Sequence, residues 1–177
     1  MIAQFQTLSH AAKSRGFRFL LIGGHAVNAY GYSRKTFDLD LLINRDDSES
    51  WRELMLSLGY NCIHEQAAFI QFAATDIPQV DLMKVSKNTF EKLMETSELR
   101  TALGMETRVP SLESLIAMKL HAARHSLPHR RHKDLMDIFA LVEANDVDVT
   151  SDGFRQLCEK YGTAELYAEI VKSKRST

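Results

Sequence analysis

The chain has 177 residues, a formal net charge of −1, a hydrophobic fraction of 45% and two cysteines. This length suits one domain or a core with a small appendage, and the near-neutral charge excludes binding of polyanions through bulk charge alone. No stretch approaches the roughly 18 consecutive apolar residues of a membrane span, the first residues lack a signal-peptide pattern, and two cysteines are too few for a disulfide framework, so we expect a cytoplasmic protein.

The sequence predicts that helices and short strands alternate in the first part of the chain. Apolar residues at helical spacing predict the helices, and short aliphatic or aromatic runs bounded by Gly or Pro predict the strands. In chain order we expect a helix over 2–15, a strand over 17–22, a short helix over 25–31, a strand over 37–43, a helix over 46–59, a hairpin of strands over 60–65 and 68–74, a strand over 79–85, a helix over 88–96, and a strand or strand pair over 99–109. Asp46, with Glu49 three residues later, is typical of a capping box.

The pattern changes at Pro110-Ser111, after which every predicted element is helical. The expected helices cover 111–126, 132–145, 151–161 and 163–173. The fold class predicted from the sequence is therefore α+β: a small mixed-sheet core over residues 1–110, followed by a helical segment over 111–177 that packs on the core.

Three aspartates lie between apolar residues in two of the predicted strands. Asp38 and Asp40 are two residues apart, so strand alternation points their side chains to one face. Two adjacent carboxylates repel unless a cation compensates them, and Mg²⁺ takes carboxylates together with phosphate oxygens and water. Asp81 joins this face if its strand pairs beside the first, where it can bind a second ion or act as a general base.

A glycine pair precedes the aspartates in the sequence. Gly23 and Gly24 end a predicted strand, and glycine lets the backbone approach a ligand closely. The helix that follows directs free N–H groups toward the same place, which favours a triphosphate. Alone, an acidic pair often marks a solvated surface and a glycine pair a turn; their combination at this spacing favours a catalytic site.

This arrangement resembles the nucleotidyltransferase superfamily that includes DNA polymerase β. The superfamily motif is an apolar residue, Gly, Gly or Ser, a gap, an apolar-flanked acidic pair and a later third carboxylate. The matching positions are Ile22, Gly23, Gly24, Asp38, Asp40 and Asp81. Within the superfamily the stretch looks most like small bacterial nucleotidyltransferases akin to the AbiEii toxins, which carry an Arg and a Ser/Thr before the acidic pair, here Arg34 and Thr36.

The resemblance extends to two motifs of the helical segment. "KLHAAR" contains Lys119, and "HKDLMDI" contains Lys133 and Asp134. By this resemblance Lys119 steadies phosphate charge, and Lys133 and Asp134 belong to the nucleotide-binding residues. Arg124 stands where the resemblance leads us to expect a Lys.

The resemblance implies a metal-dependent nucleotidyltransferase that moves an NMP from an NTP to a hydroxyl acceptor. Mg²⁺, or Mn²⁺, is the implied cofactor. The implied acceptor is a tRNA end or a protein, as in a toxin with an antitoxin partner. Two alternatives remain open: transfer to a small molecule of the aminoglycoside type, and a non-catalytic nucleotide-binding module.

The stretch 119–133 is strongly basic, with five Lys or Arg and four His and no acid. Such a patch can hold phosphates or an RNA backbone, although Arg130 and Arg131 also suit a solvated face. Lys119 lies on an otherwise apolar helix face and therefore calls for an anion, and Asp134 is placed to orient it or Arg34. Lys133 can pair with Asp137 one turn later.

Overall fold

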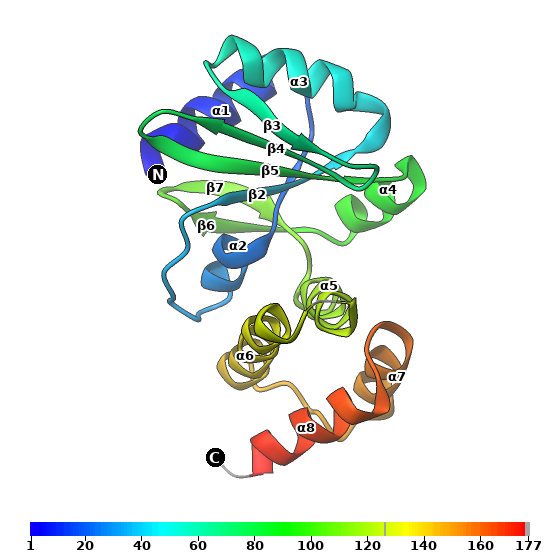
Figure 1. The fold of residues 1–177 in the computed structure, drawn as a ribbon. Helices are drawn as coiled ribbons and strands as arrows, with labels where there is room; N and C mark the ends of the chain where they lie inside the picture. The colour runs from blue at the N-terminus through cyan, green and yellow to red at the C-terminus, as the bar shows by residue number, and fades with distance from the viewer. Residues whose placement is uncertain (126, 176–177) are drawn as a thin grey trace. The chain divides into compact units, whose positions relative to one another are not determined.

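The computed structural model describes residues 1–125 and 127–175, without the side chains of residues 128–130 and 175. It is an α+β protein, as the sequence predicts (Figure 1). Its elements in chain order are α1 (Ile2–Ser14), β1 (Leu20–Leu21), α2 (Gly23–Ala29), β2 (Leu39–Asn44), the 3-10 turn η1 (Arg45–Asp47), α3 (Ser48–Ser57), β3 (Asn61–Glu65), β4 (Phe69–Ala74), β5 (Ile77–Val85), α4 (Lys87–Glu95), β6 (Glu98–Ala102), β7 (Met105–Val109), α5 (Leu112–His125), α6 (Pro128–Ala144), α7 (Asp152–Tyr161) and α8 (Ala164–Arg175).

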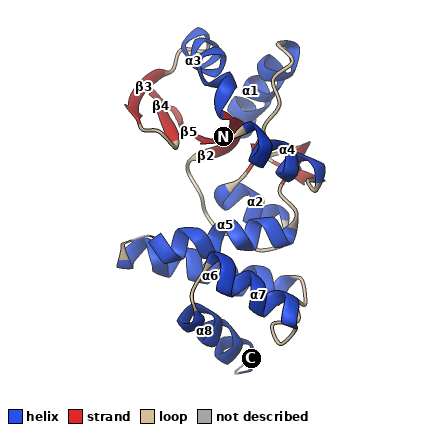
Figure 2. Ribbon diagram, turned by 90° about the vertical axis from the view of Figure 1, so that its right-hand side faces the viewer, coloured by secondary structure: helices blue, strands red, loops and turns tan. Residues whose placement is uncertain are grey.

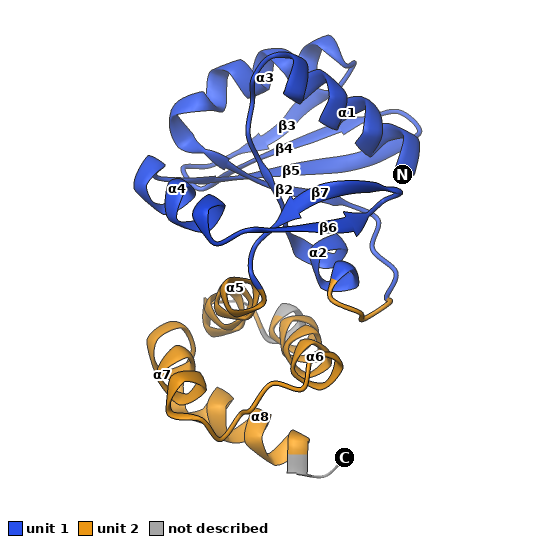
Figure 3. Ribbon diagram, turned by 180° about the vertical axis from the view of Figure 1, so that it is seen from behind, with its two compact units in different colours: residues 1–29, 34–111 blue, residues 30–33, 112–177 orange. Residues whose placement is uncertain are grey.

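Two compact units divide the chain, and each is described by itself (Figure 3). The sheet unit comprises residues 1–29 and 34–111, and the helical unit comprises residues 30–33 and 112–177. The change of pattern at Pro110-Ser111 in the sequence coincides with the end of the sheet unit. Residues 30–33, however, belong to the helical unit although the chain on both sides of them belongs to the sheet unit.

The sheet unit is built on a five-stranded sheet with the order β1-β2-β5-β4-β3. Only the central pair, β2 and β5, is parallel; the other neighbours run antiparallel. The expected hairpin is β3–β4. The region over 99–109, expected to be one strand or a strand pair, forms a second, two-stranded sheet of β6 and β7. Joining β2 to β5 in parallel requires a crossover, which the chain makes through α3 and the hairpin.

One face of this sheet carries the core of the unit. Strand alternation places Leu39, Leu41, Val80 and Leu82 on that face, and all four are fully buried. The helices α1 and α3 lie over it, whereas α2 and the β6–β7 hairpin lie on the other side of the sheet (Figures 1 and 2). Trp51 of α3 adds to the core through ring contacts with Phe17 and Phe19, which lie between α1 and β1. The opposite face of β2 and β5 is therefore where polar strand residues lie.

Three sequence expectations differ from the structure. The capping box of Asp46 and Glu49 does not form, because Asn44 caps a 3-10 turn there and the α-helix begins only at Ser48. The strand expected over 17–22 is restricted to two residues, since only these pair with β2. The second helix of the helical unit begins at Pro128, earlier than expected, because proline suits the first helical position.

The helical unit consists of α5, α6, α7 and α8 together with residues 30–33. Its buried side chains recur at helical spacing, as on α5, where Leu115, Ile116 and Leu120 face inward. Tyr30 is buried within this unit, and the Asn145 side-chain amide donates a hydrogen bond to its carbonyl oxygen at 3.0 Å. Within the described residues, the helices all fall short of the length and apolarity that crossing a membrane demands.

Removing the Phe72 ring tests the core of the sheet unit. Phe72 is fully buried on β4, so Phe72→Ala should lower the free energy of unfolding by about 3–5 kcal/mol. Ile63 of β3 is half exposed, so Ile63→Ala should change it by less than about 1 kcal/mol. The single tryptophan, Trp51, lies in this core, and its fluorescence during urea unfolding measures both. Equal effects of the two substitutions would contradict this assignment of the core.

Candidate functional site

Asp40 and Asp81 lie side by side on the central parallel strands. Asp40 of β2 is the register partner of Asp81 of β5, and paired residues of neighbouring strands point to the same face of a sheet. Both are partly exposed, whereas the neighbours on the other face are buried. Asp38 precedes β2 by one residue and is exposed. The fold therefore brings two of the three predicted carboxylates together on the face away from the core, with the third two residues along the chain.

Gly23 lies directly against the Asp40 carboxylate. The Ile22 amide donates to the Asp40 carbonyl oxygen at 2.9 Å, which ties the end of β1 to β2. At the next residue the backbone turns with φ +61°, and a Cβ there would come within 1.9 Å of Asp40 Oδ2. Glycine is required for both reasons: it accepts the positive φ, and it leaves room for the carboxylate.

Gly24 lies against the other two predicted phosphate-binding residues. A Cβ at this position would lie 2.7 Å from Thr36 Oγ1 and 2.9 Å from Arg34 Nη2. Asn28 of α2 fixes the backbone of this loop, because it accepts from the Arg34 amide at 3.1 Å and donates to the Arg34 carbonyl at 3.0 Å. Sequence reasoning missed Asn28, although an amide side chain within a short, mainly apolar helix was the available signal.

Two glutamines hold the Asp81 carboxylate. Gln79 Nε2 donates to Asp81 Oδ1 at 2.8 Å, and Gln71 Nε2 lies 3.3 Å from Oδ1 and 3.2 Å from Oδ2. Sequence reasoning missed both. Gln79 was detectable in principle, since it precedes Asp81 by two residues on one strand and shares its face. Gln71 was not, because its position depends on the register of β4 against β5.

His25, the first residue after the glycine pair, is a buried side chain of α2. It is 7% exposed, and its Nε2 has no hydrogen-bond partner among the described residues. Burial, with the positive charge of Arg34, lowers the pKa of the imidazole, and the charge of Asp38 opposes this only in part. Burial within the fold therefore favours the neutral form of His25.

The carboxylates supply the type of donor that Mg²⁺ prefers, without forming a closed cage. Within residues 1–125 and 127–175, no three acidic, histidine or cysteine side chains converge closely enough to hold a metal ion by themselves. Mg²⁺ commonly binds through one or two carboxylates and completes its octahedral shell with water and substrate phosphates. The pair of Asp40 and Asp81, with the Gly23 turn packed against Asp40, fits a metal of that kind.

Lys119, Asp134 and Asp137 form a buried ion triad inside the helical unit. Lys119 Nζ of α5 lies 2.9 Å from Asp134 Oδ1 and 2.8 Å from Asp137 Oδ2, both on α6. Asp137 is 1% exposed. Burial disfavours the charge of Lys119, but the charges and hydrogen bonds of the two aspartates outweigh it and raise the pKa of the ammonium. The predicted contact between Lys119 and Asp134 is present.

The two aspartates account for the burial of Lys119, so no bound anion is needed to explain it. Two carboxylates already neutralise Lys119, so its action on phosphate stays a prediction, as does the nucleotide contact of the exposed Lys133. In the same basic stretch, Arg131 Nη2 lies 3.4 Å from Glu169 Oε1, which satisfies part of its charge. The side chain of Arg130 lies outside the described residues.

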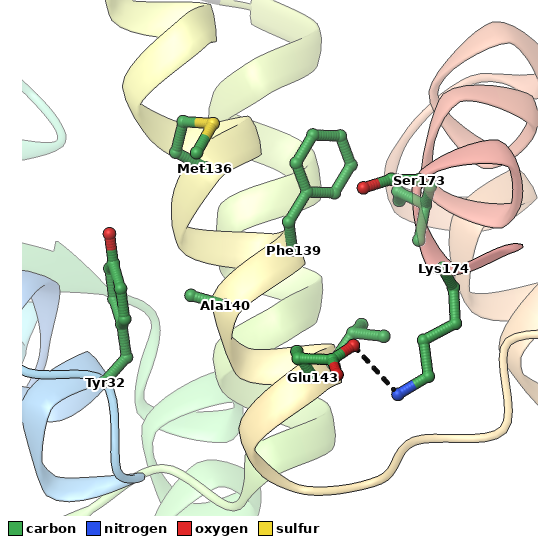
Figure 4. A pocket seen from close by; sticks show the side chains of 9 residues that line it. Tyr32, Met136, Phe139, Ala140, Glu143, Ser173 and Lys174 are labelled. Atoms are coloured by element: carbon green, nitrogen blue, oxygen red, sulfur yellow. Dashed lines mark hydrogen bonds and ion pairs between the residues drawn. The ribbon is translucent and has the colours of Figure 1, made fainter. Parts of the chain in front are cut away.

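The helical unit also contains a hollow of about 250 Å³ on α6 and α8 (Figure 4). Its lining is mainly apolar, and in Figure 4 Phe139 lies between Tyr32 on one side and Ser173 and Lys174 on the other. Glu143 Oε2 accepts from Lys174 Nζ at 3.2 Å, so the charged pair that borders the hollow satisfies itself. None of the site residues predicted from the sequence lines it.

Comparison with protein families gives one match over nearly the whole chain. A family model described as "Uncharacterised nucleotidyltransferase" matches residues 1–173. A comparison with curated proteins finds no match.

Solved structures share this fold at low sequence identity. The solution structure of the antibiotic-resistance factor ANT(2'')-Ia is similar with a TM-score of 0.63 and 18% identity, covering 99% of this chain and 91% of that one. An antigenic nucleotidyltransferase-like protein from Paracoccidioides brasiliensis has a TM-score of 0.60 and 13% identity, covering 97% and 92%. The lincosamide antibiotic adenylyltransferase LnuA, bound to lincomycin, has a TM-score of 0.55 and 15% identity, covering 80% and 95%.

Alanine at Gly23 tests the contact between the glycine turn and Asp40. Gly16 is the matched control, because it has φ +74° but nothing within 4 Å of an added Cβ. Gly16→Ala should cost only the backbone term of about 1–2 kcal/mol. Gly23→Ala should cost about 1–3 kcal/mol more, since its Cβ overlaps the carboxylate. Urea unfolding followed by Trp51 fluorescence measures both; an equal cost at the two sites would contradict the contact.

Removing the lysine of the triad should destabilise the helical unit. Lys119→Met leaves two carboxylates buried without a cation and should cost about 3–5 kcal/mol at neutral pH. The triple variant Lys119→Met, Asp134→Leu, Asp137→Leu should recover most of that loss, because it removes the stranded charges as well. Urea unfolding followed by far-UV circular dichroism measures both. A Lys119→Met protein as stable as the parent would show that the triad does not form.

The fold raises the pKa of the Lys119 ammonium, because the two aspartates stabilise its charged form. Its contribution to stability is therefore fully present below the unfolded pKa of about 10.4. That contribution is lost only as the pH rises through the higher, folded pKa. The comparison at neutral pH is therefore free of this titration.

Proposed function

The chain belongs to the family of uncharacterised nucleotidyltransferases, and on this basis we propose that it transfers an NMP from an NTP to a hydroxyl acceptor. The observation that carries the proposal is the pair of in-register carboxylates, Asp40 and Asp81, against the glycine turn at Gly23. Positioning and charge neutralisation are the main catalytic demands of phosphoryl transfer, and this arrangement addresses both.

The triphosphate would bind along the loop between α2 and β2. Arg34 and Thr36 lie directly over Gly24, where a guanidinium can form charge-assisted hydrogen bonds to phosphate oxygens and a hydroxyl can donate one more. Asn28 holds the backbone of Arg34 in place. This loop therefore combines a fixed main chain with two side-chain donors beside the carboxylates.

Asp38, Asp40 and Asp81 are the residues that would hold Mg²⁺ or Mn²⁺. A divalent ion bound there with the NTP neutralises charge on the attacking and leaving oxygens. Asp81 is the candidate to receive the proton of the acceptor hydroxyl, because its carboxylate lies one strand beyond Asp40. The family resemblance alone supports the roles proposed for Lys119 at the phosphate charge and for Lys133 and Asp134 at the nucleotide.

A macromolecular acceptor, a tRNA end or a protein, is the first candidate. The observation that favours it is the basic stretch on α5 and α6, where Arg124 and Lys133 remain exposed. Phosphate contacts from such side chains orient RNA without reading its sequence. In this form the protein would act as a toxin and would require a protein antitoxin as its partner.

A small-molecule acceptor is the second candidate, since ANT(2'')-Ia and LnuA, which share the fold, modify antibiotics according to their names. The same fold supports many functions, so the residues at the site must decide between the acceptors. A purely nucleotide-binding role would not require all three aspartates, and the chain retains them.

The decisive experiment incubates the protein with Mg²⁺ and each labelled NTP in the presence of total tRNA, of cell lysate, or of an aminoglycoside panel. We expect label on one acceptor class, and a loss of at least about 100-fold in Asp40→Asn and Asp81→Asn because each removes a metal ligand. Asp46→Asn, a change at an exposed acid on η1, is the matched control and should keep full activity. Transfer that survives in Asp40→Asn would exclude this mechanism.

A further inference from the structure

The Asp81 carboxylate is bound asymmetrically by the two glutamines. Oδ1 accepts from Gln79 at 2.8 Å and from Gln71 at 3.3 Å, whereas Oδ2 accepts only from Gln71, at 3.2 Å, among the described residues. Each carboxylate oxygen offers about two lone-pair sites. Oδ1 is therefore filled by amide donors, and Oδ2 keeps one open lone pair.

Both glutamines are held by the sheet itself. Gln79 lies on β5 with Asp81, two residues before it, and Gln71 is the register partner of Asp81 on β4. The three side chains share the face that also carries Asp40. The donors thus approach Asp81 from its own strand and from β4, and Asp40 lies on the remaining side, on β2.

The choice of an amide matters at this position. An amide N–H donor stabilises an ionised carboxylate and adds no net charge, whereas a Lys or Arg would neutralise the ligand that a divalent cation needs. Restricting a carboxylate by hydrogen bonds also lowers the cost of ordering it when the ion arrives.

We propose that Gln71 and Gln79 are positioning residues that fix the Asp81 carboxylate so that its free Oδ2 lone pair remains available to the divalent cation. This rests on the proposed function, in which Asp81 is a metal ligand. The two amides act through Asp81 and need no contact with the nucleotide or the acceptor. Their loss should therefore weaken metal binding while leaving nucleotide affinity in the absence of metal unchanged.

Metal binding measured without turnover tests this inference. The Kd of Mn²⁺ is determined by electron paramagnetic resonance in the presence of a non-hydrolysable NTP analogue. Gln79→Met and Gln71→Met, which keep side-chain length but remove the donor, should raise it about 10-fold, as loss of a hydrogen bond to a metal ligand typically does. Gln156→Met, at an exposed glutamine of α7, is the matched control and should leave it unchanged.

The glutamate variants separate positioning from packing. Glu has the shape of Gln but only accepts hydrogen bonds when ionised, so Gln79→Glu repels Asp81 at a 2.8 Å contact. Positioning therefore predicts that the Mn²⁺ Kd rises more in Gln79→Glu than in Gln79→Met, in a comparison where both variant proteins have the same melting temperature. Packing predicts the reverse order, because Glu is the better isostere. The reverse order would overturn the inference.

Asp81→Asn distinguishes this inference from the proposed function. If Asp81→Asn weakens Mn²⁺ binding but neither methionine variant does, the positioning role is wrong and the transferase proposal stands. If Asp81→Asn leaves Mn²⁺ binding unchanged, Asp81 is no metal ligand, and the positioning role is wrong whatever the transfer assay shows. The inference stands if Asp81→Asn and both methionine variants weaken binding and the Gln156→Met control does not.

Discussion

The parallel pairing of β2 with β5 is the constraint on which the site depends. It sets Asp40 directly opposite Asp81, although the two lie 41 positions apart in the sequence. The core holds this register in place, because Leu39, Leu41, Val80 and Leu82 fill the other face of the same strands. A shift of one residue would turn an aspartate into the core and a leucine out of it, so apolar burial and carboxylate placement are two results of one alignment.

Asp81 lies beside a second carboxylate, and the hydrogen-bond donors that hold it are neutral amides. Gly23 brings backbone to Asp40, and two side-chain amides bind Asp81. The helical unit solves a similar problem differently, with one lysine between two aspartates. Amide donors leave a carboxylate charged and able to bind a cation, whereas the triad takes its cation from the chain itself.

Local patterns in the sequence predicted most elements and the faces of Asp40 and Asp81, because side-chain alternation along a strand is a local property. Features that depend on pairing were beyond reach. Gln71 meets Asp81 only through the hairpin register, which shifts after Phe72, and Asp137 meets Lys119 only through the packing of α5 on α6. The predicted capping box at Asp46 was wrong, because the Asn44 side chain accepts from the Asp46 amide and caps a 3-10 turn there. The family resemblance supplied the functional hypothesis, and the pairing of strands and helices in the structure revealed which residues contact the predicted site residues.

The four residues 30–33 give the chain an unusual modularity. They belong with the C-terminal helices, where Tyr30 is buried and bound by Asn145, yet they sit inside the loop that joins Gly24 to Arg34. A truncation or protease cut after Ser111 would therefore remove Asn145, the partner of Tyr30, and would leave that buried ring exposed between Gly24 and Arg34. The chain passes between the two units at residues 29/30, 33/34 and 111/112, so a single cut after Ser111 does not separate one unit from the other.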